Sequence, residues 1–428
     1  MKKQLLDRVE ILAIGSELLT PHYQDTNSLF LTQQLNDCGF EVSFKTIVGD
    51  DWENLLLSIS LALGRAGLIL AVGGLGPTAD DLTRQAFAKV LRRKLVLDKE
   101  VMRRIRSRFE QRKMSMPASA IKQAYVIEGA VSFPNRKGTA PGQWLEAGTK
   151  KIVLLPGPPH ELKAMFEEFV RPRLEAQRRG YLARKTLKTT GLTESKTESL
   201  ISDLYPRSSD VKVTLLASPG QIEVHLVAFS AESHTLAEKK LDRLKKRISA
   251  RLRDYVFSED GQELEEVVGE LLRGRKETLA VAESCSGGLL GHRLTNVPGS
   301  SDYFLEGVIA YSNDAKTSLL AVAPSLLAKH GAVSLEVARA MARSIRLRAG
   351  SDYGLAVTGI AGPAGSTPRK PVGLVFIALD SPEGTEVWKN LFLGSRQQVK
   401  FQSAQKALDM LRRRLLGLSI FRGEKRKK

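Results

Sequence analysis

The chain has 428 residues, more than one ordinary hydrophobic core accommodates, so two or three domains are expected. Hydrophobic residues make up 42% and aromatic residues 6%, as in ordinary globular proteins, and no apolar run approaches the roughly 20 residues of a membrane span. The two cysteines, Cys38 and Cys285, are too far apart in sequence to indicate a disulfide framework, and no apolar stretch follows the N-terminal lysines, so we expect a cytoplasmic protein that does not enter a membrane.

The formal net charge is +18, which by itself would suit nucleic acid, a membrane surface or an anionic substrate. Much of the excess lies between residues 92 and 113 and in a basic tail over residues 421–428. Neither segment interleaves aromatic with basic residues, as proteins that bind single-stranded nucleic acid usually do. The pattern favours a solvated helix face and tail. A nucleic-acid partner is therefore disfavoured, and RNA binding is the weakest alternative.

Residues 1–180 alternate between apolar runs and amphipathic stretches. Strands are predicted over residues 9–15, 41–48, 68–72 and 151–155, with helices over residues 27–38 and from about 51 to 65. Strands that alternate with helices form βαβ units and a parallel sheet. We therefore expect a doubly wound α/β domain in this part of the chain.

The remaining chain divides into two further predicted domains and the tail. Residues 181–258 follow the order strand, helix, strand, strand, helix (βαββα), which is typical of a small α+β domain. Residues 259–420 return to an α/β pattern. Its apolar strands are predicted over residues 278–282, 307–311, 354–357 and 372–379, with glycine-rich turns after them.

Three of these turns carry small polar residues typical of an active site. They are Ala282-Glu283-Ser284-Cys285-Ser286-Gly287-Gly288, Tyr311-Ser312-Asn313-Asp314-Ala315-Lys316 and Val357-Thr358-Gly359-Ile360-Ala361-Gly362-Pro363. In an open parallel sheet, turns at the carboxyl ends of the strands converge on one crevice. Ser284 follows a strand and precedes a helix, where backbone N–H groups can hold an oxyanion. The spacing therefore predicts a crevice lined by Ser, Thr, Tyr and Lys side chains.

A serine nucleophile needs a base, and no histidine lies in these turns. Lys316 is the candidate base, provided that burial or a neighbouring charge lowers its pKa. Either the protonated lysine or Tyr311 could return the proton to an amide leaving group. Cys285 is the rival nucleophile, but it also lacks a histidine partner. A purely structural interpretation stays open, because a Ser/Gly-rich turn taken alone is often only a helix cap.

The same segments, with His330-Gly331-Ala332-Val333-Ser334 and Lys370-Pro371-Val372-Gly373, closely resemble the C-terminal domain of the CinA (competence-damage-inducible) family. The resemblance implies an α/β nicotinamide-nucleotide amidohydrolase of pyridine nucleotide recycling, which needs no cofactor and converts nicotinamide mononucleotide to nicotinic acid mononucleotide and ammonia. It also implies Ser284 as nucleophile, Lys316 as base and Tyr311 as a positioning group, in a protein expected to be a homodimer. The implied substrate-binding residues are Glu283, Gly287, Gly288, Asn313, Thr358, Gly359, Gly362 and Arg396, the last pairing with the nucleotide phosphate.

A second set of motifs lies in the N-terminal domain. Gly73-Gly74-Leu75-Gly76-Pro77-Thr78-Ala79-Asp80-Asp81 follows a strand, and its glycines would let backbone amides approach an anion. Carboxylates at strand ends beside such a loop, Asp50 and Asp81 among them, suggest a divalent metal that bridges to substrate. The alternative is that Asp81 and Asp51 only cap helices.

This part of the chain resembles the molybdopterin-binding-like domain of the same family. The resemblance rests on Gly15–Leu19, Asp25–Ser28, Gly73–Asp81, Gly138–Gly142 and Pro156–Glu161. It implies a nucleotide site, with metal-dependent ADP-ribose pyrophosphatase activity in some relatives and with Asp50 and Asp81 as the metal ligands. The implied site residues are Asp25, Asn27, Asp50, Gly73, Gly74, Gly76, Thr78, Asp80, Asp81 and Glu161. The alternative function is a pterin- or adenine-nucleotide-binding protein with one or both sites inactive.

Overall fold

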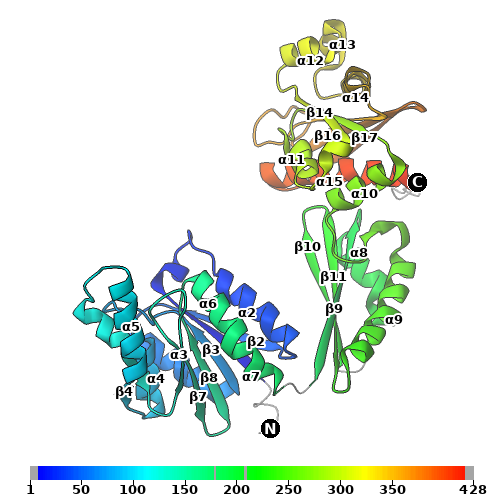
Figure 1. Ribbon diagram of the computed structural model, residues 1–428. Coiled ribbons are helices and arrows are strands. Elements are labelled where there is room, and N and C mark those ends of the chain that lie inside the picture. The colour runs from blue at the N-terminus through cyan, green and yellow to red at the C-terminus, as the bar shows by residue number, and fades with distance from the viewer. Residues whose placement is uncertain (1–7, 178–179, 207–209, 420–428) are drawn as a thin grey trace. The chain divides into compact units, whose positions relative to one another are not determined.

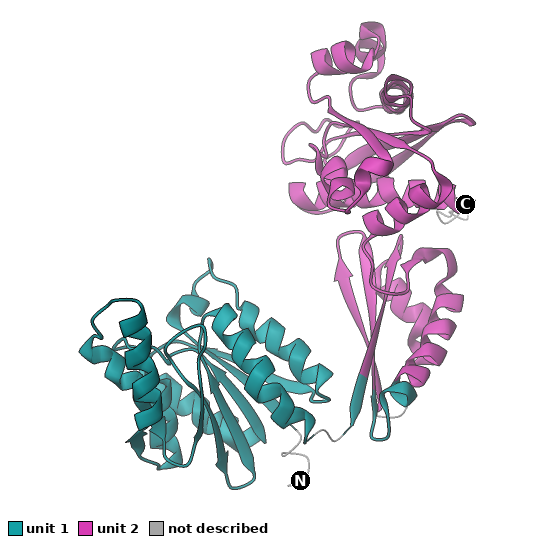
Figure 2. Ribbon diagram, viewed as in Figure 1, with its two compact units in different colours: residues 1–182, 229–237 teal, residues 183–228, 238–428 magenta. Residues whose placement is uncertain are grey.

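The computed structural model describes the chain except for residues 1–7, 178–179, 207–209 and 420–428, so the predicted basic tail lies outside the described residues. The chain forms two compact units, residues 1–182 with 229–237 and residues 183–228 with 238–428 (Figure 2). Within the described ranges, no helix has both the length and the apolar character needed to cross a membrane.

Unit 1 is built on a six-stranded sheet in the order β2-β1-β3-β8-β7-β6 (Figure 1). Its strands are β1 (Val9–Ile14), β2 (Val42–Val48), β3 (Leu68–Val72), β6 (Val131–Phe133), β7 (Gly142–Ala147) and β8 (Lys150–Leu155). Strands β2, β1, β3 and β8 pair in parallel, as the alternating pattern predicts. Strand β7 pairs antiparallel with β8, and β6 pairs antiparallel with β7. A separate two-stranded ribbon joins β4 (Leu95–Leu97) to β5 (Tyr125–Ile127).

Helices cover both faces of this sheet, because its central strands bury side chains on both sides. On one face Leu12 and Ile14 pack with Leu55 of α3, and on the other Ile11 packs with Leu31 of α2. The helices of unit 1 are α2 (Thr26–Asp37), α3 (Trp52–Arg65), α4 (Thr83–Leu91), α5 (Lys99–Gln111), α6 (Pro159–Met165) and α7 (Arg171–Glu175). This arrangement confirms the doubly wound α/β prediction.

The middle segment, most of which belongs to unit 2, forms a four-stranded sheet in the order β10-β11-β9-β12. Strand β10 pairs antiparallel with β11, and β12 pairs antiparallel with β9. Its elements are β9 (Tyr181–Thr190), α8 (Glu194–Ile201), β10 (Val211–Ser218), β11 (Gln221–Ser230), α9 (His234–Leu252) and β12 (Val256–Ser258). Ser218 pairs with Gln221, so Pro219 and Gly220 form the predicted hairpin turn. Gly220 has a φ of 78°, which glycine adopts without strain. The short strand β12 is not evident in the sequence.

The C-terminal part of unit 2 is a five-stranded sheet in the order β14-β13-β15-β16-β17. Its strands are β13 (Leu279–Glu283), β14 (Phe304–Ile309), β15 (Tyr353–Gly359), β16 (Leu374–Ser381) and β17 (Gly384–Leu391). Strands β14, β13 and β15 are parallel to one another. Strand β16 pairs antiparallel with β15, and β17 pairs antiparallel with β16. The three parallel strands are those that the predicted site turns follow, and their carboxyl ends lie at one edge of the sheet.

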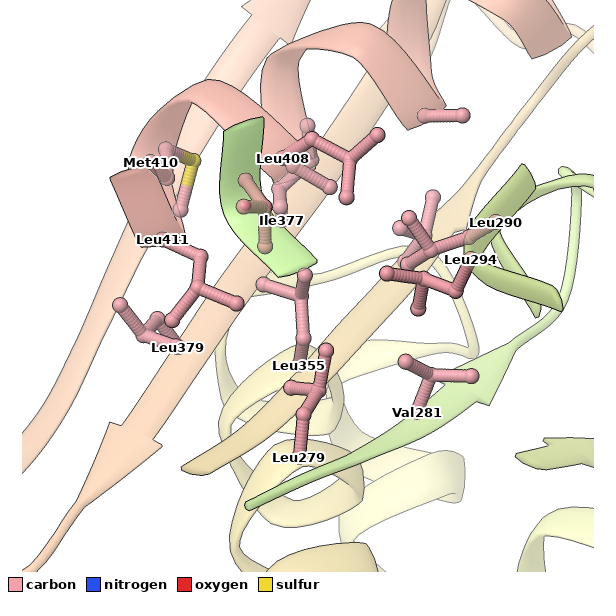
Figure 3. Close-up of a cluster of buried hydrophobic side chains, with 14 of the residues drawn as sticks. Leu279, Val281, Leu290, Leu294, Leu355, Ile377, Leu379, Leu408, Met410 and Leu411 are labelled. Atoms are coloured by element: carbon pink, nitrogen blue, oxygen red, sulfur yellow. The ribbon is translucent and has the colours of Figure 1, made fainter. Parts of the chain in front are cut away.

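The two faces of this sheet bury different side chains, as the pleat requires. Figure 3 shows one core, in which Leu279, Val281 and Leu355 pack against Leu290 of α11 and Leu408 of α15. The opposite face carries small residues such as alanine and glycine, and the carbonyl oxygen of Ala342 on α14 lies only 2.1 Å from where a Cβ on Gly354 would be. The helices are α10 (Leu264–Arg275), α11 (Leu289–Thr295), α12 (Asn313–Leu320), α13 (Pro324–His330), α14 (Leu335–Ala349) and α15 (Arg396–Leu415).

Candidate functional site

The predicted nucleophile and base lie in contact. Ser284 is the first residue after β13, and Lys316 lies in the first turn of α12, which follows the neighbouring strand β14. The Nζ atom of Lys316 is 3.0 Å from Ser284 Oγ, within hydrogen-bond distance. Ser284 is 8% exposed and Lys316 is 1% exposed, so their contact is shielded from bulk water.

Burial makes the charged form of Lys316 less favourable, because desolvation lowers the pKa of its amine below the ordinary value. Besides Ser284, the Nζ atom lies 2.8 Å from the carbonyl oxygen of Ala310 and 3.4 Å from that of Tyr311. A neutral amine carries two hydrogens and one lone pair. The two hydrogens match the two carbonyl acceptors, and the lone pair matches the hydroxyl donor of Ser284. The surroundings therefore suit an uncharged lysine that accepts a proton from the serine.

The turn after Ser284 presents free backbone donors. The N–H groups of Cys285 and Ser286 have no hydrogen-bond acceptor among the described residues, whereas the N–H of Gly287 donates to the Ser284 carbonyl at 3.1 Å. Gly287 and Gly288 have φ angles of 62° and 88°, which a side chain would strain. Unpaired amides beside a nucleophile are the groups that stabilise an oxyanion.

Cys285 is poorly suited to be the nucleophile. Its side chain is buried in the hydrophobic core below the turn, and desolvation raises the pKa of its thiol to about 12. The thiolate is the reactive form of cysteine, so a thiol that stays protonated at neutral pH is inert. The structure therefore favours the serine over the cysteine.

Glu283, predicted to bind substrate, is buried and has a different set of contacts. Its two carboxylate oxygens accept the backbone N–H groups of Leu290 at 3.0 Å and Gly291 at 2.8 Å. These are two of the first N–H groups of α11, which have no partner within the helix. Glu283 therefore fixes the start of α11 against the end of β13 and sets the shape of the turn that carries Ser284.

Arg396 joins two of the predicted turns. Its guanidinium donates to the carbonyl oxygen of Gly362 and to the hydroxyl of Tyr311, both at 2.8 Å. Both Arg396 and Tyr311 are exposed, so this corner of the site is open to solvent. Because no carboxylate neutralises Arg396 within the described residues, its positive charge remains available to an anion.

The other predicted substrate-binding residues of unit 2 shape the site in different ways. Thr358 is buried, and its hydroxyl donates to the carbonyl oxygen of Ala332 at 2.8 Å, so it holds the neighbouring loop. A Cβ on Gly359 would lie 2.7 Å from the Leu374 carbonyl oxygen, which explains the glycine. Asn313 is exposed at the start of α12.

A second candidate site is a cavity of about 630 Å³ in unit 1, beside the ends of β1 and β3. Nine of the ten predicted residues line it: Asp25, Asn27, Asp50, Gly73, Gly74, Gly76, Asp80, Asp81 and Glu161. The tenth, Thr78, is not among the lining residues. Its backbone N–H donates to Asp81 Oδ2 at 2.8 Å, and its hydroxyl contacts the same oxygen.

The two predicted metal ligands each have one oxygen already engaged. Asp50 Oδ2 accepts the N–H of Ser16 at 2.8 Å, and Asp81 Oδ2 accepts that of Thr78. Asp51 caps α3, as the structural alternative predicted for it. In the described part of the chain, no group of three or more His, Cys, Asp or Glu side chains could hold a metal ion. A magnesium ion here would take further oxygens from substrate phosphates, which is how Mg²⁺ often binds.

Sequence reasoning missed three residues near these sites. Gln123 lines the unit 1 cavity, and Lys122 Nζ donates to the Thr78 carbonyl at 2.6 Å. In unit 2, Lys400 Nζ lies 3.3 Å from where a Cβ on Gly287 would be. The only signal for Lys400 was its position four residues after Arg396, on one face of a helix.

The α/β fold, with a contact between a serine and a lysine at the end of a central strand, is consistent with the hydrolase class of proteins. Comparisons identify the particular family. Residues 261–415 match the CinA C-terminal domain, residues 184–258 the damage-inducible protein CinA KH domain, and residues 10–176 a probable molybdopterin binding domain.

Curated relatives match over nearly the whole chain. A CinA-like protein of Koribacter versatilis is 46% identical over 95% of this chain and 99% of its own length. A putative competence-damage inducible protein of Caldicellulosiruptor bescii is 43% identical over 95% and 99%. The solved structure of the protein CinA from Thermoplasma acidophilum is 29% identical, with a TM-score of 0.37, over 39% of this chain and 97% of that one. The chain belongs to the CinA family.

Proposed function

We propose that the C-terminal part of unit 2 hydrolyses the carboxamide of nicotinamide mononucleotide, yielding nicotinic acid mononucleotide and ammonia. The observation that carries the proposal is the 3.0 Å contact between Ser284 Oγ and the buried, depressed-pKa amine of Lys316. The choice of substrate rests on the family resemblance, and the geometry of the Ser284–Lys316 contact is compatible with amide hydrolysis.

In the first half-reaction, Ser284 Oγ attacks the carboxamide carbon while its proton passes to Lys316 Nζ. The carboxamide oxygen becomes an oxyanion, for which the free N–H groups of Cys285 and Ser286 are the available donors. The C–N bond then breaks as the protonated Lys316 returns the proton to the nitrogen, and ammonia leaves. An ester between Ser284 and the nicotinoyl group remains.

In the second half-reaction, water attacks this ester and gives its proton to the now neutral Lys316. The bond to Ser284 Oγ breaks, and the ammonium of Lys316 returns that proton to the serine. The product carboxylic acid ionises in water. Burial helps both halves, because Lys316 must be uncharged at the start of each.

The test is ammonia release from nicotinamide mononucleotide, with nicotinic acid mononucleotide quantified in the same samples. We expect Ser284→Ala to lower kcat by about 1000-fold or more while the thermal unfolding midpoint stays the same. The matched control is Cys285→Ala in the same turn, which should retain most of the activity. Full activity in Ser284→Ala, or its loss only in Cys285→Ala, would contradict the assignment.

We propose a second function for the unit 1 cavity, which is binding of a phosphorylated nucleotide or pterin. The glycine-rich loop and the carboxylates of Asp50 and Asp81 line one cavity, a combination suited to phosphates with a divalent cation. The molybdopterin-domain match supports the same ligand class.

ADP-ribose with and without Mg²⁺ tests this second function. Turnover that requires Mg²⁺ and is lost in Asp81→Asn supports a pyrophosphatase. Calorimetric binding without turnover supports the binding-protein alternative. Absence of both binding and turnover, for ADP-ribose and for a pterin phosphate, would exclude the proposed function of this cavity.

A further inference from the structure

We propose that the cavity between α5 and residues 134–141 is a second anion site of unit 1, which binds a small ligand that carries a diphosphate group. It is separate from the cavity at the glycine-rich loop, and the inference depends on neither of the proposed functions. It gives a role to part of the basic segment over residues 92–113, which the sequence pattern indicated to be a solvated helix face.

The cavity has a volume of about 420 Å³ and a strongly basic lining. Arg103, Arg104 and Arg108 line it from α5, and Arg136 lines it from residues 134–141. Of the described residues that form the lining, none is an aspartate or a glutamate. Four guanidinium groups around one concave surface create a positive potential that favours an anion.

Ion pairs at the rim neutralise these cations only in part. Glu100 pairs with Arg104, and Glu168 pairs with Arg136, but neither carboxylate is among the lining residues. Arg103 lies 3.9 Å from the same Glu100, at the limit of an ion pair. The side chains in these pairs are exposed, and exposed pairs contribute little to stability. The three arginines can therefore turn to a ligand at small cost.

Arg108 is more deeply placed than the other arginines. Its guanidinium donates to the carbonyl oxygen of Arg136 at 3.1 Å and to that of Lys137 at 2.6 Å. Its Nε atom is buried and has no hydrogen-bond partner in the described part of the chain. A partly desolvated cation held by carbonyl dipoles gains electrostatic energy when an anion binds close to it.

The wall opposite α5 in sequence, residues 134–141, is fixed by its own hydrogen bonds. Asn135 Oδ1 accepts the N–H groups of Lys137 at 3.0 Å and Gly138 at 2.6 Å. Its Nδ2 atom donates to the carbonyl oxygen of Ala140 at 2.9 Å. Thr139 lines this cavity and the glycine-rich loop cavity, so the segment separates the two. A wall that is already ordered reduces the entropy lost when a ligand binds.

A small phosphorylated ligand suits this cavity better than nucleic acid does. The volume lies within the range of about 300–1000 Å³ that is typical of small-molecule sites. Among the described lining residues there is no aromatic side chain on which the bases of a single strand could stack. Several guanidinium groups match the several oxygens of a diphosphate, which could be inorganic or part of a nucleotide.

Calorimetry of the full chain, with inorganic pyrophosphate and with ADP as separate probes, tests the proposal. EDTA is present, because anion binding beside Asp50 and Asp81 would depend on a divalent cation. We expect Arg103→Gln/Arg104→Gln to weaken one equivalent of pyrophosphate binding by about 10- to 100-fold at an unchanged thermal unfolding midpoint. Arg103→Gln alone, which keeps the pair between Arg104 and Glu100, should cause part of this loss.

Arg106→Gln is the matched control, since it removes an exposed charge of α5 that does not line the cavity. Binding elsewhere in the chain is common to both variants, so the difference between them isolates this cavity. Tighter binding of ADP than of pyrophosphate, with the same loss in Arg103→Gln/Arg104→Gln, identifies a nucleotide as the source of the diphosphate. Binding of ADP no tighter than that of pyrophosphate identifies the free diphosphate.

Two results would overturn the site. The first is an unchanged affinity and stoichiometry of both probes in Arg103→Gln/Arg104→Gln. The second is that neither probe binds at this cavity, whereas a single-stranded oligonucleotide binds to the wild type and not to this variant. That outcome would make α5 a nucleic-acid surface instead of the wall of a small-ligand site.

Discussion

The guanidinium of Arg396 donates to the hydroxyl of Tyr311 at 2.8 Å, across 85 residues of sequence. The same guanidinium donates to the carbonyl oxygen of Gly362. One side chain thereby joins the connection after β14, the connection after β15 and the start of α15. Tyr311 is 60% exposed, so its hydroxyl is held by this bond rather than by burial.

Replacing Tyr311 by Phe tests whether this tyrosine positions Arg396 or transfers a proton. If it positions the arginine, KM for nicotinamide mononucleotide should rise about tenfold with kcat nearly unchanged, because a hydrogen bond to a charged group is lost at an exposed site. Tyr353→Phe is the matched control, since it removes a hydroxyl bonded to Glu277 at the other end of β15. A large fall in kcat with KM unchanged would instead make Tyr311 the proton donor.

The pH dependence of activity should reflect Lys316. Desolvation lowers the pKa of this amine below its ordinary value of 10.5, and the reaction needs the neutral form. The rate should therefore fall about tenfold per pH unit below the pKa of Lys316 and level off above it. Lys316→Arg, which cannot lose its proton, should be inactive throughout the range. A wild-type rate that is flat with pH where chemistry limits turnover would contradict Lys316 as the base.

Glu283→Gln tests the carboxylate that fixes the start of α11. In this variant the NH₂ group of the glutamine faces one of the two backbone N–H groups, which then has no acceptor. We therefore expect the free energy of unfolding to fall by about 1–3 kcal/mol. The melting transition of the variant should fall by a few degrees, together with kcat, because the turn carrying Ser284 shifts. Glu270→Gln on the exposed face of α10 is the control. If the variant has normal stability but a raised KM, the result would instead support the predicted role of Glu283 in substrate binding.

The sequence alone determined the local features. Apolar runs ending in Gly- and Ser-rich turns located β13, β14 and β15 and placed Ser284 just after β13, because the pattern of a buried strand and the signals of a turn are local. The motifs also led to Lys316 as the candidate base. The direction of β16 and the strand β17 were not determined, since strand orientation depends on pairing between segments distant in sequence.

Only the tertiary structure decided which side chains remain free to act. Glu283 was predicted to be a site residue, but in the folded chain both of its carboxylate oxygens accept backbone N–H groups of α11. Lys400 carries no motif, yet α15 brings its amine against Gly287, and no carboxylate of the described residues pairs with it. The depressed pKa of Lys316 likewise comes from burial by surrounding elements. Desolvation and hydrogen-bond partnership depend on neighbours in space, and for that reason sequence spacing did not reveal them.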